Sequence, residues 1–143
     1  MRYSTKLLGV LSAVLVCAGC DFLLSLSPAT TTVRLVNLSD FPVEVTIFID
    51  DEQDLPEDLL TEVGTEIQFT VAAGDTMTFS RECDAFQVMI VGDADLRIVG
   101  GIGPEARSDV LRDGDDFSCG DTITFTFDHS AAILDFDVST SVQ

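Results

Sequence analysis

Two cysteines near the start of the chain, Cys17 and Cys20, are separated by two residues. A CxxC pair of this spacing can exchange disulfides or supply two ligands to a zinc ion. A thioredoxin-like pair is expected inside a folded domain, at the start of a helix that follows a buried strand. A zinc site needs further Cys or His ligands close by, and the next one in the sequence is Cys83. The residues around the pair therefore decide its chemistry.

Those residues have the form of an export leader. Arg2 and Lys6 make a short positive start, the apolar segment 7–16 carries no charge, and two small residues follow it. This order is typical of a secretory signal peptide. The apolar segment is shorter than the roughly 20 residues that a membrane-spanning helix needs. We expect residues 1–19 to be a signal peptide, with which Cys17 is removed.

The stretch Val16-Cys17-Ala18-Gly19-Cys20 resembles the lipobox of bacterial lipoproteins, in which Ala-Gly-Cys ends the leader. The resemblance covers only the leader, and it departs from the family pattern at Cys17, where an aliphatic residue is usual. It implies that the sulfur of Cys20 is lipidated, that the chain is cut before it, and that the new amino group is acylated. Two or more acyl chains anchor a protein stably. The resemblance thus implies a membrane-anchored protein of the bacterial cell envelope, facing the periplasm or the exterior. The alternative is an ordinary secreted protein that is cut nearby.

Lipidation of Cys20 would leave two cysteines in the folded part of the chain, Cys83 and Cys119. An even pair in an exported, oxidising compartment predicts one disulfide. Closing this loop is worth about 3–4 kcal/mol in the chain-entropy model. The same compartment argument disfavours a metal-binding or catalytic thiol at either position.

Two acidic segments could hold a cation. Residues 50–58 lack the glycine and the closing glutamate of an EF-hand loop, and residues 113–121 have carboxylates without a defined ligand spacing. Oxygen-rich loops nevertheless suit Ca²⁺, which takes about six to eight oxygen ligands. The candidate ligands in the second segment are Asp113, Asp115, Asp116 and Asp121. Asp93 and Asp95 form a smaller group of the same kind. A solvated loop is the simpler explanation, and Ca²⁺ binding through these loops is the alternative function.

His129 is the one histidine, and Asp128 and Ser130 beside it suggest a catalytic triad. Neighbouring residues on a strand point to opposite faces, so these three cannot form a proton relay. The glycine-rich residues 100–104 lack the Lys-Ser/Thr ending of a phosphate-binding loop. We expect no enzymatic activity, and no cofactor other than the Ca²⁺ of the alternative.

The chain that follows the leader is strongly acidic. It contains 25 acidic residues against five arginines and no lysine, a formal charge of −20. Such a charge repels nucleic acid and anionic lipid headgroups, so neither is expected as a direct ligand. It favours a basic ligand or an envelope protein as partner, although an acidic surface also simply keeps a protein soluble.

The elements that must position these residues show a period of two. Apolar and polar side chains alternate over 43–50, 66–71, 122–128 and 134–139. This alternation is typical of strands with one buried face. Less regular strand-forming segments cover 31–38, 75–81, 85–91 and 95–99. About eight short strands predict an all-β domain, either an antiparallel β-sandwich or a barrel-like form.

At most one or two short helical turns are expected. Asp54–Glu57 resembles a capping box that leads into a helix over 58–63, and Gly103-Pro104 could begin a turn through 107–111. Residues 37–42 predict a hairpin turn between the first two strands. Residues 74–79 and 120–125 repeat one turn-then-strand pattern, Gly-Asp-Thr-x-Thr-Phe, which we interpret as architecture.

The chain therefore divides into a signal peptide (1–19), a lipidated Cys20 with a tether (20–32), and one β-sandwich domain (33–143). We predict a non-enzymatic binding or structural module of the cell envelope. Its expected partners are the membrane, through the lipid anchor, and an envelope protein or a basic ligand.

Overall fold

The computed structural model describes residues 29–98, 101, 103–129 and 135–143. The predicted signal peptide and Cys20 lie outside these residues. The described elements are β1 (Thr30–Asn37), β2 (Val43–Asp50), α2 (Glu57–Val63), β3 (Thr65–Val71), β4 (Thr76–Glu82), the 3-10 turn η1 (Cys83–Ala85), β5 (Val88–Leu96), β6 (Glu105–Ala106), β7 (Leu111–Arg112), β8 (Thr122–Asp128) and β9 (Asp137–Val142). No helix in these stretches is long and apolar enough to cross a bilayer. The last three residues of the predicted tether, 30–32, belong to β1.

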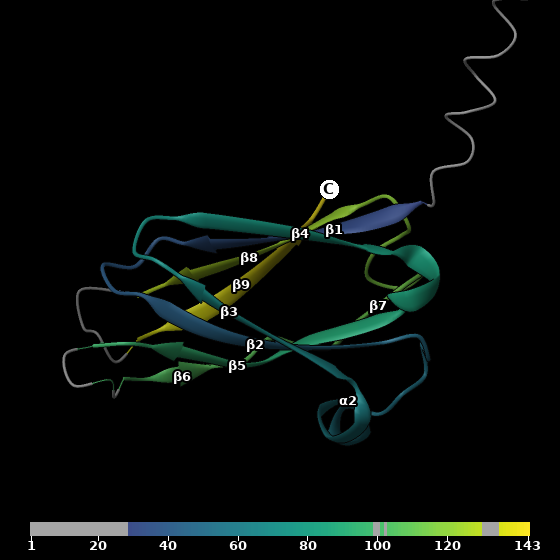
Figure 1. The fold of residues 1–143 in the computed structure, drawn as a ribbon, viewed down its shortest axis with the longest axis horizontal. Coiled ribbons are helices and arrows are strands. Elements are labelled where there is room, and N and C mark those ends of the chain that lie inside the picture. Colours follow the sequence, from purple (N-terminus) through teal and green to yellow (C-terminus); the bar gives the residue numbers. More distant parts are fainter. Residues whose placement is uncertain (1–28, 99–100, 102, 130–134) are drawn as a thin grey trace, which may run out of the picture.

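The strands of the described residues form two sheets that pack face to face (Figure 1). One sheet has the strand order β4-β1-β8-β9, and the other has the order β3-β2-β5-β6, with β7 also paired to β5. In Figure 1 the first sheet is the upper layer, and α2 lies beyond the lower layer. The predicted all-β sandwich is confirmed, and neither sheet closes into a barrel.

The core lies between the two sheets and follows from strand alternation. Every second residue of β2, from Val43 to Ile49, is buried. β8 buries Ile123, Phe125 and Phe127 in the same way. Because successive side chains of a strand point to opposite faces, these residues meet in one apolar layer between the sheets.

A β-bulge in β5 joins two segments that the sequence predicts as separate strands, 85–91 and 95–99. The register between β2 and β5 shifts between Thr46 and Ile47, opposite Gly92. A Cβ atom at Gly92 would lie 2.6 Å from the Phe48 ring, so the bulge needs glycine there.

α2 covers part of the outer face of the second sheet. Leu60 in the helix and Leu55 before it pack on the apolar outer side chains of β5. The predicted helix is confirmed, but the predicted capping box is wrong, because Pro56 is the N-cap residue and no side chain caps the helix. Pro56 has an extended backbone, with ψ 151°. This conformation leads the chain into the first turn of α2 without a side-chain cap.

The connection 37–42 carries the chain from one sheet to the other, so the predicted hairpin turn is wrong: β1 lies in the first sheet and β2 in the second. The side chain of Asn37 is fully buried here. Its Nδ2 atom donates to the carbonyl oxygens of Phe41, at 2.8 Å, and Val71, at 3.0 Å. These contacts between segments distant in the sequence direct the crossing.

Two further predictions are corrected by the strand pairing. β1 and β8 pair in parallel, whereas an antiparallel sandwich was expected. Since a parallel pair needs a long crossover, the chain passes through the second sheet between these two strands. The predicted helical turn in 103–111 is also wrong, because β6 and β7 pair there with β5. The repeated turn-then-strand pattern forms β4 and β8, which lie on either side of β1.

The outer face of the first sheet is covered by hydroxyl groups. Thr32 of β1 lies beside Ser80 of β4 and Thr122 of β8, and the Oγ atoms of Thr32 and Ser80 are 3.0 Å apart. We call this surface the hydroxyl face; strand alternation and register assign to it Thr30, Thr32, Thr76, Thr78, Ser80, Thr122, Thr124, Thr126, Ser139 and Ser141. Arg34 lies in its middle, between Thr78 and Thr124.

Candidate functional site

The end of the sandwich where the chain enters the described domain carries the predicted disulfide. The backbone N–H of Cys83 donates to the carbonyl oxygen of Ala29 at 3.0 Å, just before β1 begins. The C-terminal residue Gln143 reaches the same end, where its backbone pairs with Thr122. A chain arriving from Cys20 therefore enters the fold next to Cys83.

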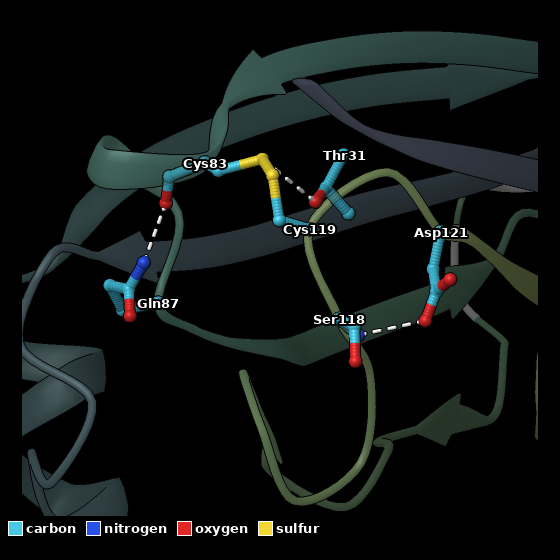
Figure 2. The surroundings of a disulfide bond; sticks show 6 residues. All are labelled: Thr31, Cys83, Gln87, Ser118, Cys119 and Asp121. Atoms are coloured by element: carbon cyan, nitrogen blue, oxygen red, sulfur yellow. Dashed lines mark hydrogen bonds between the residues drawn. A yellow bond between two sulfur atoms is a disulfide. The ribbon is translucent and has the colours of Figure 1, made fainter. Parts of the chain in front are cut away.

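The structure contains the predicted bond between Cys83 and Cys119, with the two Cα atoms 5.5 Å apart. Figure 2 shows its surroundings: the Thr31 hydroxyl lies 3.7 Å from the Cys83 sulfur, and the Gln87 amide donates to the Cys83 carbonyl oxygen at 2.7 Å. Cys83 is buried and Cys119 is exposed. The disulfide thus ties the loop before β8 to the 3-10 turn after β4.

The two predicted acidic loops, 50–58 and 113–121, lie side by side. The Arg112 guanidinium donates to the backbone carbonyl oxygens of Gln53 and Leu55, the latter at 2.9 Å. The Gln53 side chain in turn donates to the carbonyl oxygen of Asp113 at 2.5 Å. The Arg112 guanidinium and the Gln53 side-chain amide therefore join two segments that are about sixty residues apart.

The carboxylates of loop 113–121 do not converge on one point. Asp116 accepts the backbone N–H of Arg112 at 2.9 Å, and Asp121 accepts that of Ser118 at 2.7 Å. In the described part of the chain, the group of three acidic side chains close enough to share a metal ion lies elsewhere. The assignment of Asp113, Asp115, Asp116 and Asp121 as calcium ligands stays a prediction.

Calcium binding is tested by thermal unfolding in excess Ca²⁺, in EDTA, and in NaCl of matched ionic strength. We expect one midpoint in all three solutions, because two of the four candidate ligands, Asp116 and Asp121, already accept hydrogen bonds from the backbone of their own loop. A midpoint that rises in Ca²⁺ alone would establish the alternative function.

The acidic group that does converge consists of Asp93, Asp95 and Glu105, whose carboxylate oxygens lie within 4.8 Å of one another. Asp95 and Glu105 face each other across β5 and β6. Two arginines act on the group: Arg97 pairs with Asp95 at 3.4 Å and with Glu44, and the charge of Arg107 acts on Asp93. The sequence pointed to Asp93 and Asp95 but not to Glu105, because only the strand pairing brings it near.

Burial raises the pKa of Asp93, and the neighbouring charge of Asp95 raises it further. The folded state therefore binds a proton at Asp93 more tightly than the unfolded chain does, so the stability of the fold decreases as the pH rises through this pKa. Replacing Asp93 with asparagine should stabilise the fold at pH 7, and the gain should vanish below 3.8, the ordinary aspartate pKa.

Urea unfolding of Asp93→Asn at pH 7 and at a pH below 3.8 measures this gain in stability. Asp51→Asn, in an exposed loop, is the matched control. A stability gain that stays constant across the two pH values would contradict the assignment.

A polar depression of about 420 Å³ lies next to this acidic group, on the outer face of the second sheet. Its lining includes Glu44, Thr46, Thr70, Asp95 and Arg97. The guanidinium Nε atom of Arg97 is buried without a hydrogen-bond partner, although the same side chain makes two ion pairs. The three charged side chains that line the depression, Glu44, Asp95 and Arg97, therefore already bind one another.

The histidine singled out in the sequence lies at the opposite end from the disulfide. The imidazole Nε2 atom of His129 accepts the backbone N–H of Asp40 at 3.3 Å, and its ring lies 6.1 Å from that of Phe41. Ser130 lies outside the described residues. The described contacts of His129 thus hold the β1–β2 connection.

Two packed sheets, a disulfide where the chain enters, and a helix on one outer face define a small disulfide-bonded β-sandwich. No protein-family model matches the sequence, and no curated protein matches it. Among solved structures, the fold is similar to the crystal structure of the T6SS lipoprotein TssJ1 from Pseudomonas aeruginosa. The TM-score is 0.51 at 10% sequence identity, over 82% of this chain and 98% of that chain. This chain therefore has a TssJ-like fold.

A second solved structure, the NMR structure of a protein from Eubacterium rectale, has a TM-score of 0.45 at 20% identity. It covers 78% of this chain and 87% of that chain. At this level of similarity we draw no conclusion from it.

Proposed function

We propose that this protein is a lipid-anchored, non-enzymatic module of the bacterial cell envelope. The observation that carries the proposal is the lipobox-like stretch that ends at Cys20, ten residues before the first strand begins at Thr30. A membrane anchor at Cys20 would hold the sandwich close to the bilayer by the end that carries the disulfide.

The fold and the disulfide each support this proposal. The Cys83–Cys119 bond suits an exported protein, because disulfides persist in oxidising compartments. The solved structure with the similar fold is itself described as a lipoprotein. A sandwich fold hosts many functions, so this likeness adds to the leader and does not replace it.

Binding is the activity that the side chains favour. Several titratable groups of the described residues form ion pairs and loop caps, such as Arg97 with Glu44 and Asp121 with Ser118. With a formal charge of −20 after the leader, the surface favours a basic segment of another envelope protein as its partner.

The anchor is tested by expressing the full chain in bacteria with labelled palmitate. We expect label and membrane association in the wild type, and we expect Cys20→Ala to lose both, because the lipidated sulfur is absent. Cys17→Ala is the matched control and should keep both, since this residue leaves with the leader. Equal labelling of the wild type and Cys20→Ala would refute the proposal.

A further inference from the structure

We propose that the hydroxyl face lies on the lipid surface that holds the anchor, so that the domain rests on its first sheet rather than standing on its acidic end. This inference rests on the proposed lipid anchor and adds the orientation of the domain. The net charge alone predicts repulsion from anionic headgroups, whereas the distribution of charge leaves one face free to approach them.

The hydroxyl face differs in charge from the other described surfaces. The middle rows of the hydroxyl face carry no acidic side chain, whereas the same alternation and register put Glu82, opposite Thr30, and the pair Asp128 and Asp137 on this face at the two ends of its strands. The outer face of the second sheet instead carries the group of Asp93, Asp95 and Glu105. Exposed charges are screened beyond about 8 Å at physiological salt, so a bilayer on the middle of the hydroxyl face would meet Arg34 and neutral hydroxyls, with carboxylates only at the two ends of the face.

The position of the tether agrees with this orientation. β1 is an inner strand of the first sheet, and the chain enters it at Ala29. The eight residues 21–28 span at most about 28 Å even when fully extended, so the domain stays near the bilayer. Figure 1 places α2 on the far side of the sandwich from the first sheet, and the acidic loop 50–58 leads into this helix.

The other orientations bring acidic groups to the membrane. An upright domain would press loops 50–58 and 113–121 against the headgroup phosphates, because both lie at the end where the chain enters. A domain lying on its second sheet would do the same with Asp93 and Glu105. Both arrangements lose free energy by like-charge repulsion in a membrane that contains anionic lipid.

A second copy of the chain is a poorer occupant of this face. Four strands about 4.8 Å apart with four rows of side chains cover roughly 500 Å². A stable interface buries about 800 Å² on each partner. A lipid surface needs no such area, because the anchor already supplies the attachment.

The orientation can be measured with the threonine methyl groups, which occur on both outer faces. The lipidated protein, purified from membranes, is placed in nanodiscs of phosphatidylcholine and phosphatidylglycerol that carry a nitroxide on the lipid headgroup. We expect the nitroxide to abolish the methyl NMR signals of Thr78, Thr124 and Thr126. The signals of Thr46 and Thr70, on the second sheet, should remain. Loss of both sets, or loss of the Thr46 and Thr70 signals alone, would overturn the proposal.

A charge variant tests the physical cause. Thr124→Asp places a carboxylate in the middle of the hydroxyl face and should restore the Thr126 signal, whereas Thr70→Asp on the other sheet should not. Thr78→Asp, on an edge strand, repeats the test if Thr124→Asp fails to fold. An unrestored Thr126 signal in a folded variant would contradict the charge argument. In nanodiscs without the nitroxide, hydroxyl-face signals could change with the number of protein molecules per nanodisc. That result would indicate a second copy on this face and overturn the lipid proposal.

The anchor and the orientation are tested separately. Failure of the anchor appears first, as wild-type protein that does not co-purify with membranes. In that case Cys20 of the Cys17→Ala variant is coupled to a maleimide-bearing lipid, which is selective because Cys83 and Cys119 are joined to each other. The methyl signals then report the orientation alone.

Discussion

Replacing Cys83 and Cys119 together with alanine is expected to lower the free energy of unfolding by about 4 kcal/mol. The bond joins residues 36 positions apart, and in the chain-entropy model its loss frees the unfolded chain by about that amount. The tied loop also holds the start of β8, the strand that contributes Ile123, Phe125 and Phe127 to the core. Urea unfolding with linear extrapolation measures the loss.

Reduction of the wild type provides the matched comparison, because it opens the same bond without a mutation. Dithiothreitol should lower the wild-type midpoint to that of the double variant and leave the double variant unchanged. Cys20→Ala should unfold like the wild type. A reduced wild type with an unshifted midpoint would show that the bond adds nothing to stability.

Replacing Asn37 with alanine is expected to cost roughly 3 kcal/mol of stability, because buried carbonyl groups left without donors are expensive. The Asn37 amide is fully buried, and its Nδ2 atom lies 2.8–3.1 Å from the carbonyl oxygens of Phe41, Val71 and Ala72. Its Oδ1 atom accepts the backbone N–H and the hydroxyl of Ser39. One side chain thus joins the β1–β2 connection to the turn after β3.

Two further variants separate the donors from the acceptor. Ser39→Ala removes one hydroxyl and should cost only about 1 kcal/mol. Asn37→Asp keeps the acceptor but buries a carboxylate against carbonyl oxygens. The pKa of this carboxyl should therefore rise, and the stability of the variant should recover as the pH falls. A small, pH-independent loss in Asn37→Asp would show that the donated hydrogen bonds are not what holds this crossing. Urea unfolding at several pH values makes both comparisons.

The strands and their buried faces could be predicted from local pattern. Alternation over 43–50 and 122–128 identified β2 and β8 and the side chains that they bury, because one-sided burial imposes a period of two. The cysteine count, taken with the lipobox-like leader, predicted the Cys83–Cys119 bond. The expectations for Cys20, for the calcium ligands and for the absence of enzymatic activity stay predictions.

Contacts between distant segments could not be predicted in this way. The parallel pairing of β1 with β8, the crossing held by Asn37 and the meeting of Glu105 with Asp93 each depend on which strands become neighbours. Alternation says which face of a strand is buried, but it carries no information about the partner strand. The local pattern of residues 37–42 therefore fits a hairpin turn within one sheet as well as it fits a connection between two sheets.

Composition and local pattern established an acidic chain and predicted an export-type leader, the strands and the disulfide, because each of these depends on neighbouring residues or on a simple count. The arrangement of charge over the surface came only from the fold. Strand register gathers hydroxyl groups from four strands onto the middle of one face, and it leaves the carboxylates at the ends of that face, on the other sheet and in the loops. A net charge of −20 cannot reveal such a face, because it sums over all sides of the molecule.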